Sequence, residues 1–224
     1  MARKVTAHLF NSVNGVVESP NEWQFDAFGP EEMQMMGAAI GGITDVVIGR
    51  KLWQEWSGYW QAAGADDPFA QFINPVRKHV LSTTWSGDLG WNSTVIDGDP
   101  VAYVASLKEG SAGAEGNVGA EGAGGWGAGG WGAGGGGAGG GGAGAEGAGA
   151  ERDAGGISVV GGIDTIRALF LAGVVDELTL TTHPVVGVGR RLFDETVPVT
   201  RLQLVSSEST PTANAVLTYA LRKD

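Results

Sequence analysis

One segment of this 224-residue chain limits what the rest can fold into: in residues 110–156, 36 of 47 positions are glycine or alanine. Ordering glycine costs more backbone entropy than ordering any other residue, and this segment has few large side chains whose burial could offset the cost. We therefore predict a low-complexity insert at the surface. The other 177 residues hold 16 of the 40 glycines, an ordinary proportion. The sequence thus predicts one domain over residues 1–224, interrupted by the insert.

Charge and composition exclude several classes of protein. Lysine and arginine number 14 against 25 aspartate and glutamate residues, a net charge of -11 without a basic cluster, so we expect no nucleic-acid partner. The absence of cysteine excludes disulfide scaffolds, thiolate zinc sites and a cysteine nucleophile. Three scattered histidines lack metal-site spacing, and no apolar run approaches the roughly 20 residues of a membrane helix. We expect a soluble, cytoplasmic protein that binds neither a metal nor a membrane.

Short apolar runs alternate with segments of helical periodicity along the rest of the chain. The runs expected to form strands are residues 5–10, 44–48, 78–81, 93–96, 157–160, 177–183, 202–207 and 215–221. Helices are expected to begin at Pro30, near Lys51, and at Pro68, Pro100 and Ile163. Strands joined by helices predict an α/β fold with a mostly parallel sheet. No helix separates the last two strands, which predicts an antiparallel C-terminal edge.

Three of these strands end in turns that suit ligand binding. The turn at Gly49 places Arg50 and Lys51 beside free backbone N–H groups at a helix start, which favours a phosphate. Residues 81–84 offer three hydroxyl groups, and residues 160–165 place a glycine pair between a strand and a helix. Carboxyl ends of parallel strands meet at one edge, where such sheets bind ligands. Taken singly, each turn is more often a simple tight turn or a solvated surface than a ligand site.

Together and in this order, residues 10–18, 47–51, 78–84 and 159–193 resemble the dihydrofolate reductase-like superfamily. Within it, the chain is most similar to the C-terminal reductase domain of the riboflavin-specific deaminase/reductase and its stand-alone relatives. The resemblance covers the body and none of the insert. It implies a three-layer fold with helices on both faces of the sheet, binding of NADPH, and hydride transfer to a nitrogen heterocycle or a ribosylamino-pyrimidine. It also implies a homodimer.

The resemblance implies roles for the three turns. The cofactor-binding residues would be Gly49, Arg50 and Lys51 at the phosphates, Leu81, Ser82 and Thr83 at the adenosine end, and Val160, Gly161, Gly162, Ile163 and Thr165 at the pyrophosphate and nicotinamide side. Residues 11–18 would close over the nicotinamide and the substrate. The chain departs from the family in having Asn14 where an aspartate is usual. It also has Thr83 where an arginine is frequent, which removes a charge-assisted contact to a 2′-phosphate.

The proton that accompanies hydride transfer needs a donor. By analogy with dihydrofolate reductases, a carboxyl group near the first helix is the candidate, which indicates Glu31, Asp26 or Glu32, with Asn14 in the closing loop as a further catalytic candidate. Acidic residues in a first helical turn also simply favour the helix dipole. We interpret His183 as a packed strand-end residue.

Two other functions stay open at this point. The chain is alternatively a non-catalytic nucleotide-binding or interaction module on the same fold, or it self-associates through the Gly-Gly-Trp-Gly-Ala repeats around Trp126 and Trp131. Arg190 and Arg191 suit a ribose phosphate of the substrate, but exposed arginines after a glycine turn are commonly just solvated.

Overall fold

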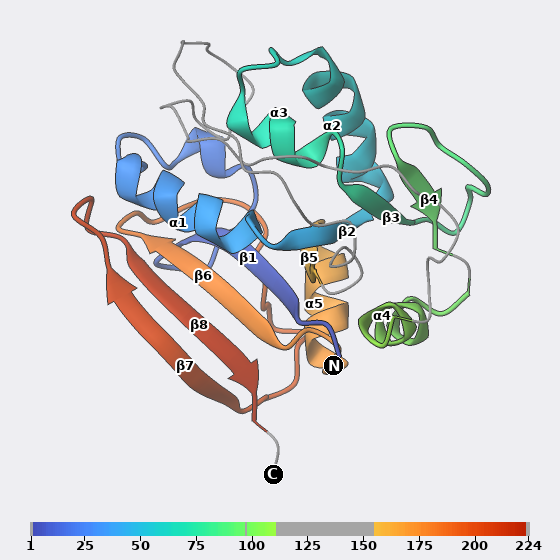
Figure 1. Ribbon diagram of the computed structural model, residues 1–224. Coiled ribbons are helices and arrows are strands. Elements are labelled where there is room, and N and C mark those ends of the chain that lie inside the picture. The colour runs from blue at the N-terminus through green and yellow to red at the C-terminus, as the bar shows by residue number, and fades with distance from the viewer. Residues whose placement is uncertain (1, 97, 111–154, 223–224) are drawn as a thin grey trace.

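The computed structural model describes residues 2–96, 98–110 and 155–222. The strands in these ranges form one eight-stranded sheet in the order β4-β3-β2-β5-β1-β6-β8-β7 (Figure 1). The strands are β1 (Val5–Ser12), β2 (Ile43–Gly49), β3 (Arg77–Leu81), β4 (Ser93–Val95), β5 (Gly156–Gly161), β6 (Glu177–His183), β7 (Leu202–Ser209) and β8 (Ala215–Leu221). Strands β1 to β6 run parallel, and β8 is antiparallel to both β6 and β7. This confirms the predicted α/β sheet with its antiparallel edge. The predicted insert lies almost entirely outside the described residues.

The helices begin at or next to the predicted residues. They are α1 (Pro30–Ile40), α2 (Arg50–Ala62), α3 (Pro68–Ile73), α4 (Pro100–Lys108) and α5 (Ile163–Leu171), with one 3-10 turn at Pro20–Glu22. Proline occupies the first turn of α1, α3 and α4, where its missing N–H group breaks no helical hydrogen bond. None of the helices in the described ranges combines the length and the apolar character needed to span a bilayer.

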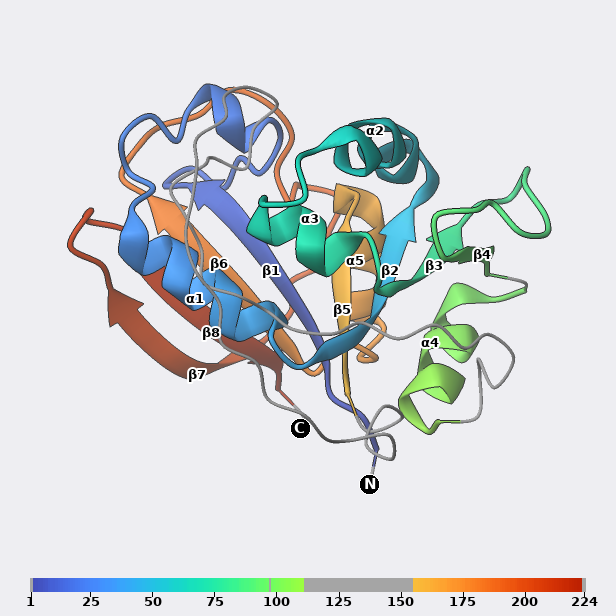
Figure 2. The ribbon, with the colours of Figure 1, turned by 45° about the horizontal axis from the view of Figure 1, so that its top comes forward.

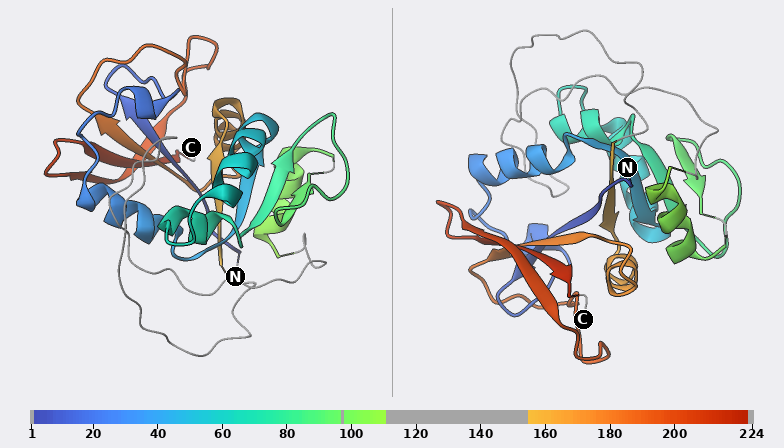
Figure 3. Two further views of the ribbon diagram at one scale, coloured as in Figure 1. Left: turned by 90° about the horizontal axis from the view of Figure 1, so that it is seen from above. Right: turned by 60° about the horizontal axis from the view of Figure 1, so that its bottom comes forward.

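Alternating side chains divide the core into two layers on either side of the sheet. Val46 and Ile48 of β2 pack with Trp60 of α2 and with residues of α1 and α3. Val47 lies between them in sequence and packs in the other cluster, with Phe170 of α5 and residues of α4. Helices α1 to α3 therefore cover one face and α4 and α5 the other, as Figures 2 and 3 show. This three-layer arrangement was the one that the family resemblance implied.

A buried ionic cluster closes the amino end of β2. The Asp45 carboxylate is fully buried and accepts hydrogen bonds from Arg3, from Arg77 at 2.9 Å and from His79 Nε2 at 2.9 Å. Burial alone would raise the pKa of Asp45, but the hydrogen bonds from His79 and Arg3 hold this pKa well below its usual range. The cluster ties the N-terminal segment to β2 and β3.

Arg3 also holds the two points at which the insert leaves and rejoins the body. Its backbone N–H donates to the carbonyl of Lys108 at 2.8 Å, and its Nε donates to the carbonyl of Gly155 at 2.6 Å. A Cβ on Gly155 would lie 2.2 Å from Thr44 Cγ2, so this re-entry point accommodates only glycine. Arg3 thus ties the end of α4 to the start of β5, the two described segments that border the insert.

Candidate functional site

The three predicted turns lie side by side at the carboxyl edge of the sheet. Gly49 at the end of β2 is in register with Leu81 of β3, and Ile48 is in register with Gly161 of β5. A Cβ on Gly49 would lie 3.1 Å from Thr165 Oγ1, so the start of α2 touches the first turn of α5. The tertiary structure therefore brings together residues that are more than 100 positions apart in the sequence.

The helices that start at this edge differ from α3 and α4 in how they are capped. Asp67 caps α3 by accepting hydrogen bonds from two backbone N–H groups of the first turn, and Asp99 caps α4 by accepting one. Helices α2 and α5 instead begin after Gly49 and Gly162, without a side-chain cap. Their first-turn N–H groups are thus left to solvent or to an anionic ligand, and the two helix dipoles favour negative charge at the same place.

The two glycines that precede α5 have different surroundings. A Cβ on Gly161 would lie 2.4 Å from Leu52 Cδ2, so glycine here allows α2 to pack against β5. A Cβ on Gly162 would meet no atom within 4 Å. Gly162 therefore faces open space at the helix start, where a ligand could approach the backbone. Val160 and Ile163, on either side of the pair, are half-buried and pack against the two core clusters.

The loop after β3 carries an aromatic residue that contacts the turn at Gly49. The guanidinium carbon of Arg50 lies 5.4 Å from the centroid of the Trp85 ring. Ser82 Oγ accepts hydrogen bonds from the backbone N–H groups of Thr84 and Trp85, at 3.2 and 3.0 Å, and so shapes this loop. Thr83 and Lys51 are exposed. Sequence reasoning missed Trp85, because no periodicity relates it to Arg50.

Asn14 joins the predicted closing loop to the segment after β6. Its Oδ1 accepts hydrogen bonds from Ser12 Oγ at 2.7 Å and from the Gly187 N–H at 2.9 Å, and its Nδ2 donates to the Gly187 carbonyl at 2.9 Å. An ionised aspartate could not donate to that carbonyl. The Asn14 amide thus satisfies both backbone groups of Gly187, which an ionised aspartate at this position could not do.

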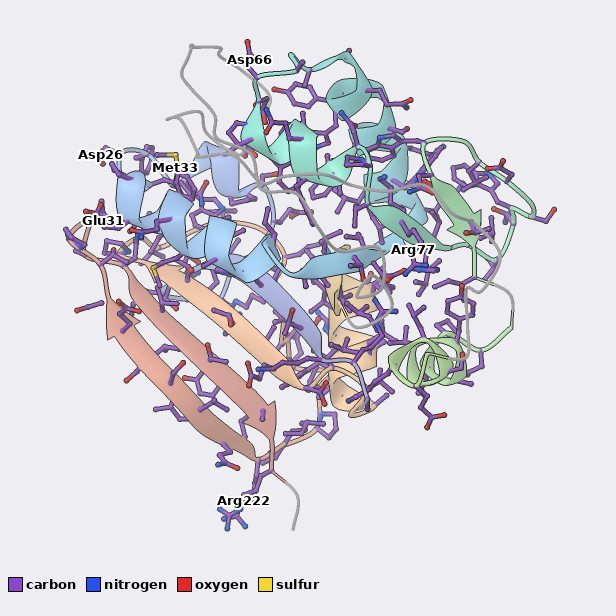
Figure 4. The ribbon with its side chains drawn as sticks, viewed as in Figure 1. Asp26, Glu31, Met33, Asp66, Arg77 and Arg222 are labelled. Carbon is purple, nitrogen blue, oxygen red and sulfur yellow. The ribbon has the colours of Figure 1, made fainter. Side chains whose placement is uncertain are left out.

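The acidic residues near α1 fall into two environments. Asp26 and Glu31 are exposed near the start of the helix (Figure 4), whereas Glu32 is 2% exposed. The Glu32 carboxylate accepts hydrogen bonds from the Gly29 N–H at 2.7 Å, from Asn214 Nδ2 at 2.9 Å and from the Thr212 hydroxyl.

This environment sets the ionisation of Glu32. Burial by itself raises the pKa of its carboxyl, but hydrogen bonds from Thr210, Thr212, Gly29 and Asn214 outweigh that effect and lower the pKa to about 2. Glu32 is therefore an ionised anchor between α1 and the β7–β8 turn, and it holds no proton to donate at neutral pH.

The rings of two histidines, His8 and His183, contact the Phe10 ring of β1. His183 is fully buried between Phe10 and Trp23, with Gln24 Nε2 3.3 Å from its Nε2. Burial lowers its pKa, and burial lowers the pKa of His8 to about 4. Both rings are thus neutral at neutral pH, and the interpretation of His183 as a packed residue is confirmed.

The described residues hold no candidate metal centre, and a surface hollow lies away from the three turns. Within residues 2–96, 98–110 and 155–222, no group of three or more histidine, aspartate and glutamate side chains could hold a metal ion. A hollow of about 210 Å³ lies at the carboxyl end of α5, lined by residues such as Leu171, Phe193 and Leu202. It contains none of the predicted site residues.

Comparison with known proteins gives a match to a family over part of the chain and to solved structures over nearly all of it. Residues 150–216, from β5 to the start of β8, match the RibD C-terminal domain. A protein from Shewanella sp. PV-4 named for riboflavin biosynthesis is similar over 100% of both chains, with a TM-score of 0.63 and 16% identity. No curated protein matches the chain in sequence.

Two further solved structures share the fold. A pyrimidine reductase-like protein from Corynebacterium diphtheriae is similar over 99% of this chain and 93% of its own, with a TM-score of 0.56 and 15% identity. The dihydrofolate reductase of Enterococcus faecalis, complexed with NADP(H) and RAB-propyl, is similar over 98% and 97%, with a TM-score of 0.50 and 13% identity. The chain thus combines a match to the RibD C-terminal domain with a dihydrofolate reductase-like fold, which confirms the resemblance inferred from its sequence.

Proposed function

We propose that this chain is an NADPH-dependent reductase of the riboflavin-biosynthesis and dihydrofolate reductase type. Its substrate would be a pyrimidine- or pterin-like heterocycle of the kind of 5-amino-6-(5-phosphoribosylamino)uracil. The observation that carries the proposal is the pair of uncapped helix starts at Gly49 and Gly162, which adjoin each other at the carboxyl edge of the sheet. The family match at residues 150–216 and the shared fold support a reductase.

The residues of the three turns fit a dinucleotide. Open space at Gly162 allows a pyrophosphate to approach the first turn of α5, with Gly161, Ile163 and Thr165 around it. Arg50 and Lys51 add positive charge at the start of α2, and the segment of Leu81, Ser82 and Thr83 would border the adenosine. When bound, the dinucleotide supplies the hydride.

The protein's own contribution to the reaction is positioning and proton supply. Asn14 would hold the closing loop against Gly187 and so limit the access of water to the substrate. Glu32 is already ionised, which leaves the exposed carboxyl groups of Glu31 and Asp26, or water, as the proton source. Glu31→Gln or Asp26→Asn should reduce turnover without weakening cofactor binding if that residue is the donor.

The decisive experiment is a titration with NADPH and NADH that follows tryptophan fluorescence in the wild type, Arg50→Ala and Lys4→Ala. Lys4 is a control cation, at the opposite end of β1 from this edge and paired with Glu177. We expect saturable NADPH binding that is weakened about tenfold or more by Arg50→Ala, because a charge-assisted phosphate contact is worth about 1.5–3 kcal/mol. Lys4→Ala should have no effect.

A substrate screen then separates the two candidate functions. Oxidation of NADPH with a pterin or an aminopyrimidine would support the reductase. Binding without turnover on any such substrate would favour the non-catalytic nucleotide-binding module. Failure to bind either nucleotide would contradict the reductase and favour a non-catalytic interaction module on the same fold.

We also propose a homodimer. The strand β7 supports it, because it is an edge of the sheet that the described residues form, and Leu204 and Val205 on it are 53% and 47% exposed. Sedimentation at several protein concentrations tests the proposal, and a monomer at all of them would refute it.

A further inference from the structure

Arg50 contacts an aromatic ring, whereas several other arginines of the chain form ion pairs with aspartates. Arg3 and Arg77 pair with Asp45, and Arg190 pairs with Asp164. Within the described part of the chain, the Arg50 side chain makes neither an ion pair nor a hydrogen bond, and its guanidinium lies over the face of the Trp85 ring. An aromatic face restricts a guanidinium without neutralising it, so the N–H donors of Arg50 stay available.

The Trp85 ring is itself fixed from two sides. It packs edge-to-face against Trp53 of α2, with ring centroids 5.5 Å apart and planes at 81°. Trp53 is anchored in turn, because its indole Nε1 donates to Ser93 Oγ at 2.8 Å. The backbone N–H of Trp85 is held by Ser82 Oγ. The ring thus forms a rigid support that links the start of α2 to the loop after β3.

We propose that Trp85 is a positioning residue that directs Arg50 toward the phosphate on the adenosine ribose, and that it thereby sets a preference for NADPH over NADH. The proposal rests on the proposed function, since it concerns the same cofactor site. Thr83 is exposed and uncharged, so it supplies no guanidinium to this phosphate. Arg50 and Lys51 are the cations at the neighbouring turn, and Arg50 is the one that an aromatic ring supports. An arginine restrained in this way loses less entropy when it binds.

Calorimetric titration with 2′,5′-ADP and 5′-AMP tests the proposal, because these two probes differ only in the 2′-phosphate and require no turnover. The variants are Trp85→Leu, Trp85→Phe and Arg50→Ala, each checked for folding by circular dichroism. Trp85→Leu should weaken 2′,5′-ADP about fivefold or more, in the range of a partly desolvated cation–π contact, and leave 5′-AMP unchanged. Trp85→Phe should restore most of the affinity, because it retains a ring.

A double variant completes the test. If Trp85 acts through Arg50, adding Trp85→Leu to Arg50→Ala should weaken 2′,5′-ADP no further. Equal weakening of both probes by Trp85→Leu, or no weakening of either, would overturn the positioning role while leaving the cofactor site intact. A wild-type protein that bound neither probe nor NADPH would instead overturn the proposed function on which this role depends.

Discussion

The anchoring role of Glu32 leads to a quantitative prediction about stability. The pKa of its carboxyl lies at about 2 in the folded protein against 4.5 for an ordinary glutamate. Each pKa unit corresponds to about 1.4 kcal/mol, so the folded environment favours the ionised form by about 3 kcal/mol. Because the folded pKa is the lower one, this stabilisation is fully present well above pH 4.5 and is lost as the pH falls toward 2.

The perturbation is Glu32→Gln, which keeps the shape of the side chain but removes the charge. The neighbouring Glu31→Gln is the matched control, because Glu31 lies in the same helical turn and is exposed. Urea denaturation at pH 7 should show that Glu32→Gln lowers the free energy of unfolding by about 3 kcal/mol, whereas Glu31→Gln changes it by less than about 0.5 kcal/mol.

The pH dependence distinguishes this mechanism from simple loss of packing. At pH 3 the difference between the wild type and Glu32→Gln should shrink by about 2 kcal/mol, because the wild-type advantage is then largely titrated away. A difference that is the same at pH 7 and pH 3 would refute the reasoning. So would a Glu31→Gln variant as unstable as Glu32→Gln.

Three further predictions concern other parts of the molecule. Burial lowers the pKa of Lys78 to about 7 from 10.5, so above pH 7 the unfolded chain binds more protons than the folded one. The free energy of unfolding of the wild type, measured in urea and compared with that of Lys78→Met, should therefore rise by about 2 kcal/mol between pH 7 and pH 9. Gly161→Ala should lower the free energy of unfolding by about 1–3 kcal/mol, because the added Cβ would clash with Leu52. Gly162→Ala should change it by less than about 0.5 kcal/mol, because its Cβ would meet open space. Equal effects of the two variants would contradict these different surroundings. Replacement of residues 111–154 by a short glycine–serine linker should leave Tm and NADPH binding unchanged, because Arg3 contacts the segments at both ends of the insert. A loss of oligomers in sedimentation would instead support self-association through the insert.

The sequence by itself determined the order and type of the elements. Hydrophobic periodicity placed β6 (Glu177–His183) and β8 (Ala215–Leu221) at their observed bounds, and the prolines at 30, 68 and 100 marked three helix starts. These features depend on residues a few positions apart. The gathering of the three turns at one edge also followed from the sequence, because consecutive parallel strands end on the same side of a sheet.

Only the tertiary structure decided the environment of individual polar side chains. Glu31 and Glu32 are adjacent and chemically alike, yet Thr212 and Asn214 bury and ionise one of them while the other stays exposed. Trp85 reaches Arg50, and Asn14 reaches Gly187 from 173 positions away. The physical reason is that the pKa, burial and orientation of a polar group depend on which distant groups replace its water, and local sequence periodicity carries no record of those partners.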